Sequence, residues 1–312
     1  MGPSRALDPL DLAGPVLGWL RRLQVREAGY DQGGLRDPLD GRVAGEHYAA
    51  THFAWCCALR HAASPDTTLR EAAFAAMAFH LRTSREEYAP GAWSYHWDFN
   101  NLASLETYLL LGREAPGALA EAWLASLRTW KTNVHWAVNW VAMRALAHFK
   151  RFQLFGAAAD RQAAGEWLAF VLASQKPDGG IEDVRGKSLP SQYHAYTACL
   201  LHRLMPAHPG VSRAVVLAAR WLLALTGPDG ESNALGRGQG QIFGYACAVY
   251  LFRTGAALDP ELAAQYRFAA QKTLERLARY QTGEGWWPLV LNRLPVERKA
   301  GWYDYHHLSV YN

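Results

Sequence analysis

Residues Ser174–Gly180 read SQKPDGG and end a pattern in which apolar and charged residues recur with helical spacing. Proline cannot continue a helix, and glycine accepts the positive φ of a tight turn, so Pro-Asp-Gly marks a helix end. Two later stretches share this signature: LTGPDGE at Leu225–Glu231 and YQTGEGWW at Tyr280–Trp287. Their central acidic residues lie about 50–55 residues apart, an interval typical of a structural repeat.

Outward from these turns, the sequence predicts two kinds of helix. The first kind is amphipathic, with its charged residues on one face, and is expected over residues 8–25, 67–83, 116–131, 157–175, 209–226 and 259–281. The second kind is apolar on nearly all faces and opens with aromatic and polar residues. Its members are HYAATHFAWCCAL from His47, DFNNLASLETYLLL from Asp98, HWAVNWVAMRALA from His135, YHAYTACLLHRL from Tyr193, QIFGYACAVYLF from Gln241 and DYHHLSVYN from Asp304.

A helix that is apolar all round must be surrounded by protein. Six such helices alternating with six amphipathic ones predict an all-α fold, an (α/α)6 toroid with an inner ring inside an outer ring. We expect one toroid domain over residues 1–312, because no change of composition marks a linker. The sixth inner segment has only about nine residues, so its helix is expected to be short or truncated.

The composition limits the kinds of partner that this chain is expected to bind. The formal net charge is +4, and the basic residues are scattered rather than banded, so nucleic acid is not expected. No uninterrupted apolar stretch is long enough for a membrane span. The four cysteines lack metal-type spacing and are expected to be buried thiols, and we predict neither a metal nor another cofactor. The N-terminus does not resemble a signal peptide, which leaves a cytoplasmic chain and a mature secreted or periplasmic chain both open.

The longer loops lead into the inner helices and are rich in glycine, tryptophan and tyrosine. Long loops at one end of a rigid scaffold are where sites are usually built. The chain holds 13 Trp, 14 Tyr and 11 Phe, and aromatic side chains suit a cleft for sugar rings. We therefore expect the first turns of the inner helices to face one cavity, with substrate contacts from Trp93, His96, Trp97, Asn100, His135, Tyr193, Gln241, Tyr305 and His306.

Two inner segments, NVHWAVNWVAMRALA and SQYHAYTACLLHRL, and also GRGQGQIFGYA, carry a family resemblance. They resemble the α/α-toroid polysaccharide lyases of the heparinase and alginate-lyase kind. The resemblance implies cleavage of a uronic-acid glycan by β-elimination, and hence an acidic polysaccharide or oligosaccharide as partner. Many of these lyases carry a β-sandwich after the toroid, and this sequence shows nothing like it.

The chemistry explains the residue types. The C5 proton of a uronate becomes acidic only when the neighbouring carboxylate is neutralised by an amide, an arginine or a protonated histidine. A histidine or an ionised tyrosine then takes that proton, and a tyrosine can protonate the leaving oxygen. The resemblance implies Asn139 as neutraliser, His194 as base or second neutraliser, and Arg237 as cationic partner. It implies Tyr196, Tyr193 or Tyr245 as the tyrosine.

Each assignment has a structural rival. Asn139 could bond between helices, His194 could cap its helix, and Arg237 could pair with Glu231. Tyr305, His306 and His307 form a second candidate cluster, but adjacent helical histidines point about 100° apart and seldom share a metal ion.

Other functions remain open on the same fold. A glycoside hydrolase needs two carboxylates flanking the bond, and the candidates are Asp98, Glu182, Asp183, Glu231 and Asp304. A glycan-binding or assembly protein could keep the toroid without the chemistry. Terpenoid cyclases have similar Gln- and Trp-rich turns, but the sequence lacks their acidic motifs.

Overall fold

The computed structural model describes residues 6–37, 41–43, 49–87, 97–132, 136–288 and 290–291. These residues form helices α1 Pro9–Leu23, α2 Ala49–Ala63, α3 Thr67–Glu87, α4 Trp97–Leu111, α5 Gly117–Arg128, α6 Val138–Phe155, α7 Ala158–Leu172, α8 Ser191–Leu204, α9 Ser212–Leu225, α10 Ile242–Leu258 and α11 Ala263–Tyr280, with the short 3₁₀ helix η2 at Pro209–Val211. The only β-structure in this part of the chain is a set of isolated bridges.

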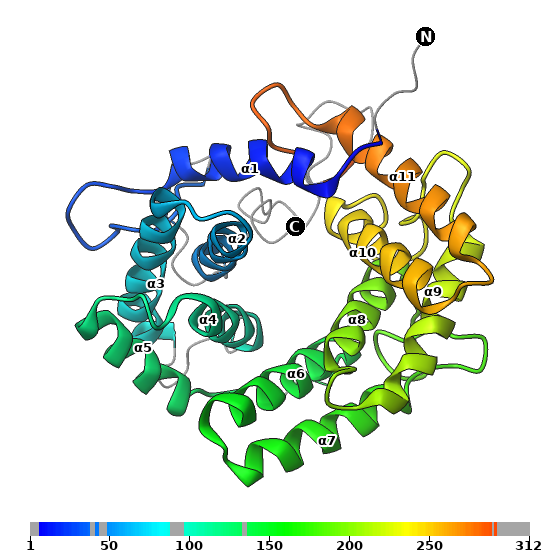
Figure 1. The fold of residues 1–312 in the computed structure, drawn as a ribbon, viewed down its shortest axis with the longest axis horizontal. Helices are drawn as coiled ribbons and strands as arrows, with labels where there is room; N and C mark the ends of the chain where they lie inside the picture. Colours follow the sequence, from blue (N-terminus) through cyan, green and yellow to red (C-terminus); the bar gives the residue numbers. More distant parts are fainter. Residues whose placement is uncertain are drawn as a thin grey trace.

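The helices alternate between two concentric rings (Figure 1). Helices α2, α4, α6, α8 and α10 form the inner ring, and each packs on the next: α2 on α4, α4 on α6, α6 on α8, and α8 on α10. Helices α1, α3, α5, α7, α9 and α11 form the outer ring. The predicted α/α toroid is therefore confirmed. The predicted sixth inner segment, from Asp304, lies outside the described residues.

The inner helices are apolar all round because protein lies on every side. Residues Val141 to Ala147 of α6 are all buried, since α6 touches α4, α7 and α8. The outer helices bury one face only. In α9, for example, Val215 and Leu222 are buried, whereas Arg213 and Arg220 on other faces are exposed. No helix in the described part of the chain is long and apolar enough to cross a membrane.

A glutamine clamp ties consecutive outer helices together. The side-chain amide at the end of one outer helix donates to a glycine carbonyl in its own turn and to a carbonyl of the next outer helix. The pairs are Gln24 to Gly33 and Ala72, Gln175 to Gly179 and Ala214, and Gln281 to Gly285 and Leu12, at 2.8–3.2 Å. The repeated turns found in the sequence are therefore joints between neighbouring repeats.

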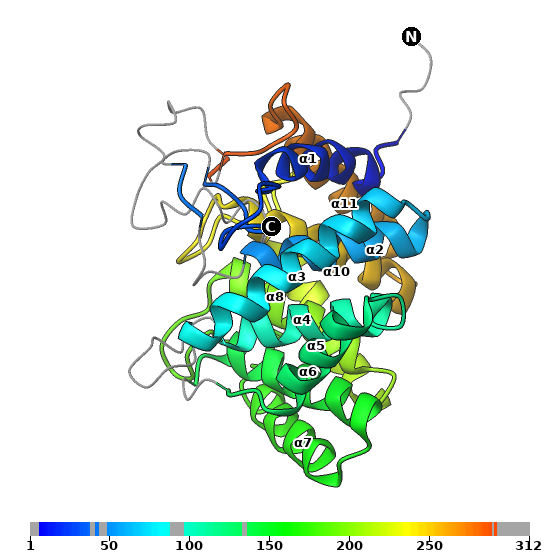
Figure 2. The same cartoon turned by 90° about the vertical axis from the view of Figure 1, so that its left-hand side faces the viewer.

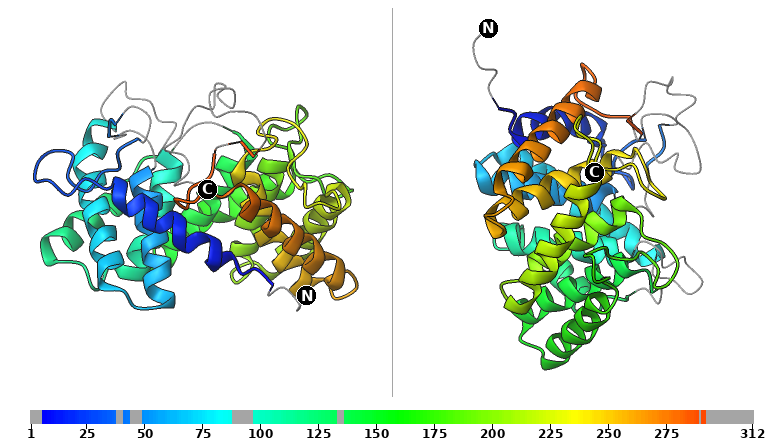
Figure 3. Two further views of the ribbon diagram at one scale, coloured as in Figure 1. Left: turned by 90° about the horizontal axis from the view of Figure 1, so that it is seen from above. Right: turned by 90° about the vertical axis from the view of Figure 1, so that its right-hand side faces the viewer.

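The last clamp closes the outer ring, because Leu12 belongs to α1. Beside it, Arg22 donates to the carbonyl of Glu284, and the rings of Trp19 and Trp286 stack with centroids 6.0 Å apart. Helices α1 and α11 accordingly meet at one edge of the molecule (Figures 1 and 3).

Gly179 shows how tightly these joints fit. Its φ is +100°, and a Cβ there would lie 2.3 Å from the carbonyl oxygen of Leu217 on α9. Gly186, in the following loop, also has positive φ but has open space around it. We expect Gly179→Ala to lower the free energy of unfolding by about 2–3 kcal/mol more than Gly186→Ala, because only the first adds a clash. Urea unfolding of both variants measures this, and equal losses would show that the joint is loose.

Candidate functional site

The N-terminal ends of the inner helices lie on one side of the ring, with the described loops before α8 and α10 (Figures 2 and 3). The loop between α7 and α8 begins with a tight turn in which the Asp178 carboxylate accepts from the amide of Gly180. It then crosses the start of α6, where the amide of Val138 donates to the carbonyl of Asp183 at 2.8 Å. This loop therefore carries Asp183 to the end of the inner ring.

Four polar side chains from four segments meet there, and we call Asn139, Asp183, Tyr193 and Arg237 the Asp183 cluster. The Asn139 amide donates to the Asp183 carboxylate at 2.6 Å. The Arg237 charge acts on the same carboxylate, and its guanidinium carbon lies 5.7 Å from the centre of the Tyr193 ring. Three of the four are residues that the sequence analysis named for the lyase, and the fourth was a candidate acid of a hydrolase.

Asp183 has an unusual environment for a carboxylate. It is 7% exposed, and burial raises its pKa, although the hydrogen bond from Asn139 and the charge of Arg237 oppose that shift. A carboxyl group held in this way can exchange a proton closer to neutral pH than a solvated one. The cluster therefore combines an acid–base group, an amide and a cation beside an aromatic ring.

His194 lies elsewhere, in the core between α8 and α9. It is fully buried, its Nδ1 accepts from the amide of Ile181 at 3.0 Å, and its Nε2 donates to the carbonyl of Ala218 at 3.0 Å. Both ring nitrogens are thus occupied, and the ring packs on Trp221 with centroids 4.4 Å apart. This geometry corrects the expected role as a base. His194 joins two helices, and its removal should disturb the fold.

Tyr245 is also placed away from the cluster. Its hydroxyl donates to the Glu231 carboxylate at 2.8 Å, and Arg276 of α11 pairs with the same carboxylate at 2.6 Å. The side chain is buried against α11, and burial raises its pKa. This arrangement gives Tyr245 a structural contact and does not favour the catalytic role expected of it. Arg276 is an ion-pair partner of Glu231, for which the sequence had offered Arg237 as an alternative.

Tyr196 does face a cavity. A central cavity of about 400 Å³ lies among α2, α8 and α10. It is lined by His52, Trp55, Leu59, Tyr196, Cys199, Leu200, Arg203, Phe243, Ala246, Cys247 and Tyr250. The Tyr196 and Phe243 rings meet edge to face at its wall, with centroids 4.8 Å apart. Tyr196 follows Tyr193 by three residues, so this wall of the cavity begins one helical turn along α8 from the Asp183 cluster.

The remaining expected contacts divide into two groups. Asn100 accepts from Thr51 at 2.8 Å, the Trp97 ring lies under Lys131, and Gln241 caps α10 with its carbonyl accepting from Asn233. These three residues therefore hold the ends of inner helices together. The other five, Trp93, His96, His135, Tyr305 and His306, lie outside the described residues.

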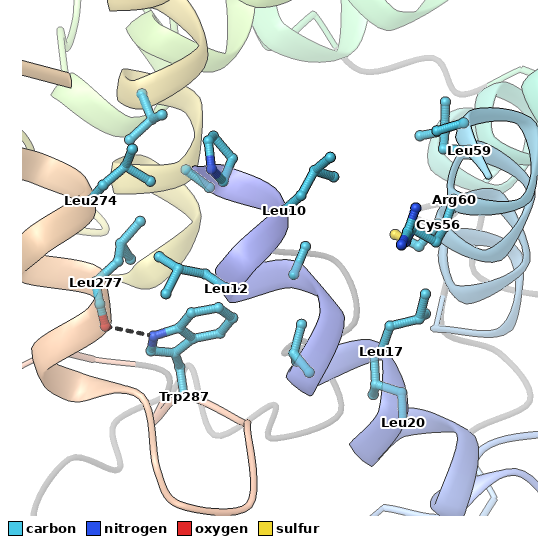
Figure 4. A pocket seen from close by; sticks show the side chains of 16 residues that line it. Leu10, Leu12, Leu17, Leu20, Cys56, Leu59, Arg60, Leu274, Leu277 and Trp287 are labelled. Carbon is cyan, nitrogen blue, oxygen red and sulfur yellow. Dashed lines mark hydrogen bonds between the residues drawn. The ribbon is translucent and has the colours of Figure 1, made fainter. Parts of the chain in front are cut away.

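A second pocket, of about 360 Å³, lies behind α1 between α2, α10 and α11 (Figure 4). Its labelled lining is mainly leucine, and the indole of Trp287 donates to the carbonyl of Leu277 at 2.8 Å. Arg60 is the one charged residue among those that line it. This pocket therefore offers no acid–base pair.

Sequence reasoning passed over Trp55 and Arg203, which lie inside helices that read as apolar. The spacing along the chain could have identified Arg203. Steps of three and four residues place four side chains on one face of α8: Tyr193, Tyr196, Leu200 and Arg203. No group of three metal-binding side chains is found among the described residues.

Two buried histidines are expected to weaken the fold in acid. Burial lowers the pKa of His80 and of His194 from the usual 6.5 to about 4. Between pH 6.5 and about pH 4, these histidines bind protons in the unfolded chain but not in the folded chain. The free energy of unfolding therefore falls as the pH falls. At pH 5 the loss relative to pH 7 is roughly 2 kcal/mol per histidine.

Urea unfolding at both pH values measures this loss, and the His194→Gln variant serves as the control because it removes one of the two titrating groups. Its stability should fall less steeply with pH than that of the parent chain. An unchanged slope would mean that His194 is not held neutral.

The rings of alternating helices define the class of this protein: an α/α toroid. No protein-family model matches the chain, and a search of curated proteins finds no match. Among solved structures it is similar to the cellobiose 2-epimerase from Bacillus thermoamylovorans, with a TM-score of 0.68 and 11% identity over 89% of this chain and 90% of that one.

It is also similar to an unsaturated glucuronyl hydrolase mutant from Streptococcus agalactiae in complex with dGlcA-GalNAc6S, with a TM-score of 0.65 and 15% identity over 96% of this chain and 89% of that one. A polysaccharide lyase matches with a TM-score of 0.60 and 14% identity over 93% of this chain and 88% of that one. At these identities the likeness shows the shared fold.

Proposed function

We propose that this chain is a carbohydrate-active enzyme, a polysaccharide lyase that cleaves a uronic-acid glycan by β-elimination at the Asp183 cluster. The observation that carries the proposal is the meeting of Arg237, Asn139 and Tyr193 beside an aromatic cavity. The solved structures that share the fold support the substrate class, since their names include a polysaccharide lyase, a glucuronyl hydrolase and sugar epimerases.

The residues take the following roles. Arg237 and the second N–H of the Asn139 amide neutralise the uronate carboxylate, which makes the C5 proton acidic. Tyr193, beside the guanidinium, takes that proton as its phenolate, because a neighbouring cation favours the ionised form. The C4–O bond breaks as the C4=C5 double bond forms, and the leaving oxygen receives a proton from a tyrosine. Tyr196 is next along the same helix face.

Asp183 positions this set, because its carboxylate accepts from Asn139 and interacts with Arg237. The same carboxyl group is the observation that favours a second candidate, a glycoside hydrolase with Asp183 as general acid. That mechanism needs a second carboxylate. Asp98 is paired with Arg144, Glu182 with Lys176, and Glu231 with Arg276, each within 3.1 Å. Asp304, the remaining candidate, lies outside the described residues, so it is the described carboxylates that favour the lyase.

The test is incubation with a panel of uronate glycans, followed by ultraviolet absorbance for the unsaturated product and by a reducing-sugar assay. A lyase raises both signals. Reducing sugar without absorbance would establish a hydrolase, and tight binding without any product would establish a binding protein.

Asp183→Asn sharpens the choice between lyase and hydrolase. It keeps the shape of the side chain, so a lyase should retain measurable turnover, whereas a hydrolase that needs the proton of Asp183 should lose it. Glu182→Gln, next in the chain, is the matched control and should leave turnover unchanged.

A further inference from the structure

The central cavity lies along the same face of α8 as Tyr193, beginning one turn further along the helix. Tyr193, Tyr196, Leu200 and Arg203 lie on one face of α8, and the rise of a helix places the two ends of this row about 15 Å apart. Tyr196, Leu200 and Arg203 line the cavity. A chain-like ligand whose reacting unit sits at Tyr193 would therefore run toward Arg203.

The Arg203 end of the cavity carries an excess of positive charge. Arg203 and Lys150 both pair with a single carboxylate, that of Glu106, and the Lys150 distance is 3.9 Å. Glu106 is 8% exposed at its side chain, whereas Arg203 keeps 25% exposure. Two cations sharing one buried anion leave one positive charge, and the more exposed partner can meet a ligand.

Trp55 supplies a second and independent observation. Its ring lines the cavity and lies under the Arg203 guanidinium, whose carbon is 5.0 Å from the ring centre. Its indole N–H is buried and has no hydrogen-bond partner among the described residues. Because solvent does not reach this N–H, the part of Trp55 that the cavity meets is its ring.

We propose that the central cavity is a subsite for an anionic sugar residue, whose carboxylate or sulfate binds Arg203. The aromatic walls formed by Trp55, Tyr196 and Phe243 contact the apolar faces of the sugar ring. This subsite rests on the proposed function, since it holds a more distant unit of the same acidic glycan.

The test measures binding rather than turnover. The Arg237→Gln variant removes the cation of the Asp183 cluster, so the remaining anion binding reports on the cavity. Sodium D-glucuronate, D-glucose 6-sulfate and D-glucose are titrated by calorimetry or by saturation-transfer NMR. We expect one or both anionic sugars to bind more tightly than glucose, and the stronger of the two identifies the anionic group.

In the same Arg237→Gln background, Arg203→Gln should weaken binding of the anionic sugar roughly tenfold or more, since a charged hydrogen bond is lost. Trp55→Leu removes one aromatic wall of the cavity, and should weaken binding by a few-fold. The matched control is Arg213→Gln, an exposed arginine on α9, which should have no effect. Melting curves establish that each variant is folded.

Equal binding of glucose and the anionic sugars would overturn the subsite, as would equal affinity of the Arg203→Gln and Arg213→Gln variants. Failure of the wild-type chain to bind any of the three sugars would overturn it too. These outcomes are separate from those of the glycan panel: anion binding that depends on Arg203 without any product would uphold the subsite and refute the lyase.

Discussion

Replacing Arg144 by methionine is expected to lower the free energy of unfolding by about 3–5 kcal/mol, because the change leaves a buried carboxylate without its counter-ion. Arg144 on α6 donates to Asp98 on α4 at 2.8 Å, and both side chains are only 2% exposed. The guanidinium also lies over Trp167 of α7 at 5.3 Å. Arg144 therefore joins two inner helices and one outer helix.

Urea unfolding measures the loss, and two further variants interpret it. Arg161→Met, on the exposed face of α7, should change stability by about 0.5 kcal/mol or less. Adding Asp98→Leu to Arg144→Met should recover part of the loss, because no unpaired charge then remains buried. If the double variant is less stable than Arg144→Met alone, the loss of stability comes from lost packing, and the explanation by charge is wrong.

Replacing Arg237 by glutamine is expected to lower kcat about 10²- to 10³-fold on the uronate glycan that the wild-type chain cleaves. The guanidinium lies beside Tyr193, and in the proposed lyase mechanism its charge would stabilise the substrate carboxylate as it gains electron density. Glutamine keeps some hydrogen bonding but no charge. Initial rates from ultraviolet absorbance, at saturating substrate, measure the effect on kcat apart from KM.

Arg185→Gln is the matched control for this second prediction. Arg185 is an exposed arginine in the loop that carries Asp183, and it lies over Phe170 at 5.3 Å. Its replacement should leave kcat within about twofold, because it makes no contact with the cluster. Comparable losses in both variants would indicate a general effect of surface charge on glycan binding.

The fold was predictable because two periodic signals agree. The Pro-Asp-Gly and Gly-Glu-Gly turns set the repeat, and the contrast between one-sided and all-round apolar helices separated the outer ring from the inner ring. What sequence could not show was the function of the glutamines. Gln24, Gln175 and Gln281 each reach a glycine carbonyl in their own turn and a carbonyl of the next outer helix, and such pairings depend on the packed geometry.

The candidate site was predictable only in part, and the reason is the direction in which helical side chains point. His194 follows Tyr193 directly, so the two lie about 100° apart around α8, and one faces the cluster while the other enters the core. Asn139, Tyr193 and Arg237 were named from resemblance and do come together. The sequence analysis named Asp183 only as a candidate acid of a glycoside hydrolase. Nothing in its acidic turn indicates that the side chain is buried.

The closed outer ring has a consequence for how the chain unfolds. In an open array of repeats, the end units have a neighbour on one side only and can melt separately. Here Gln281 binds α1 and leaves no end unit on the outer ring, so heating should give one sharp transition. Deleting α1 would convert the ring into such an array, and its denaturation curve should then broaden into steps.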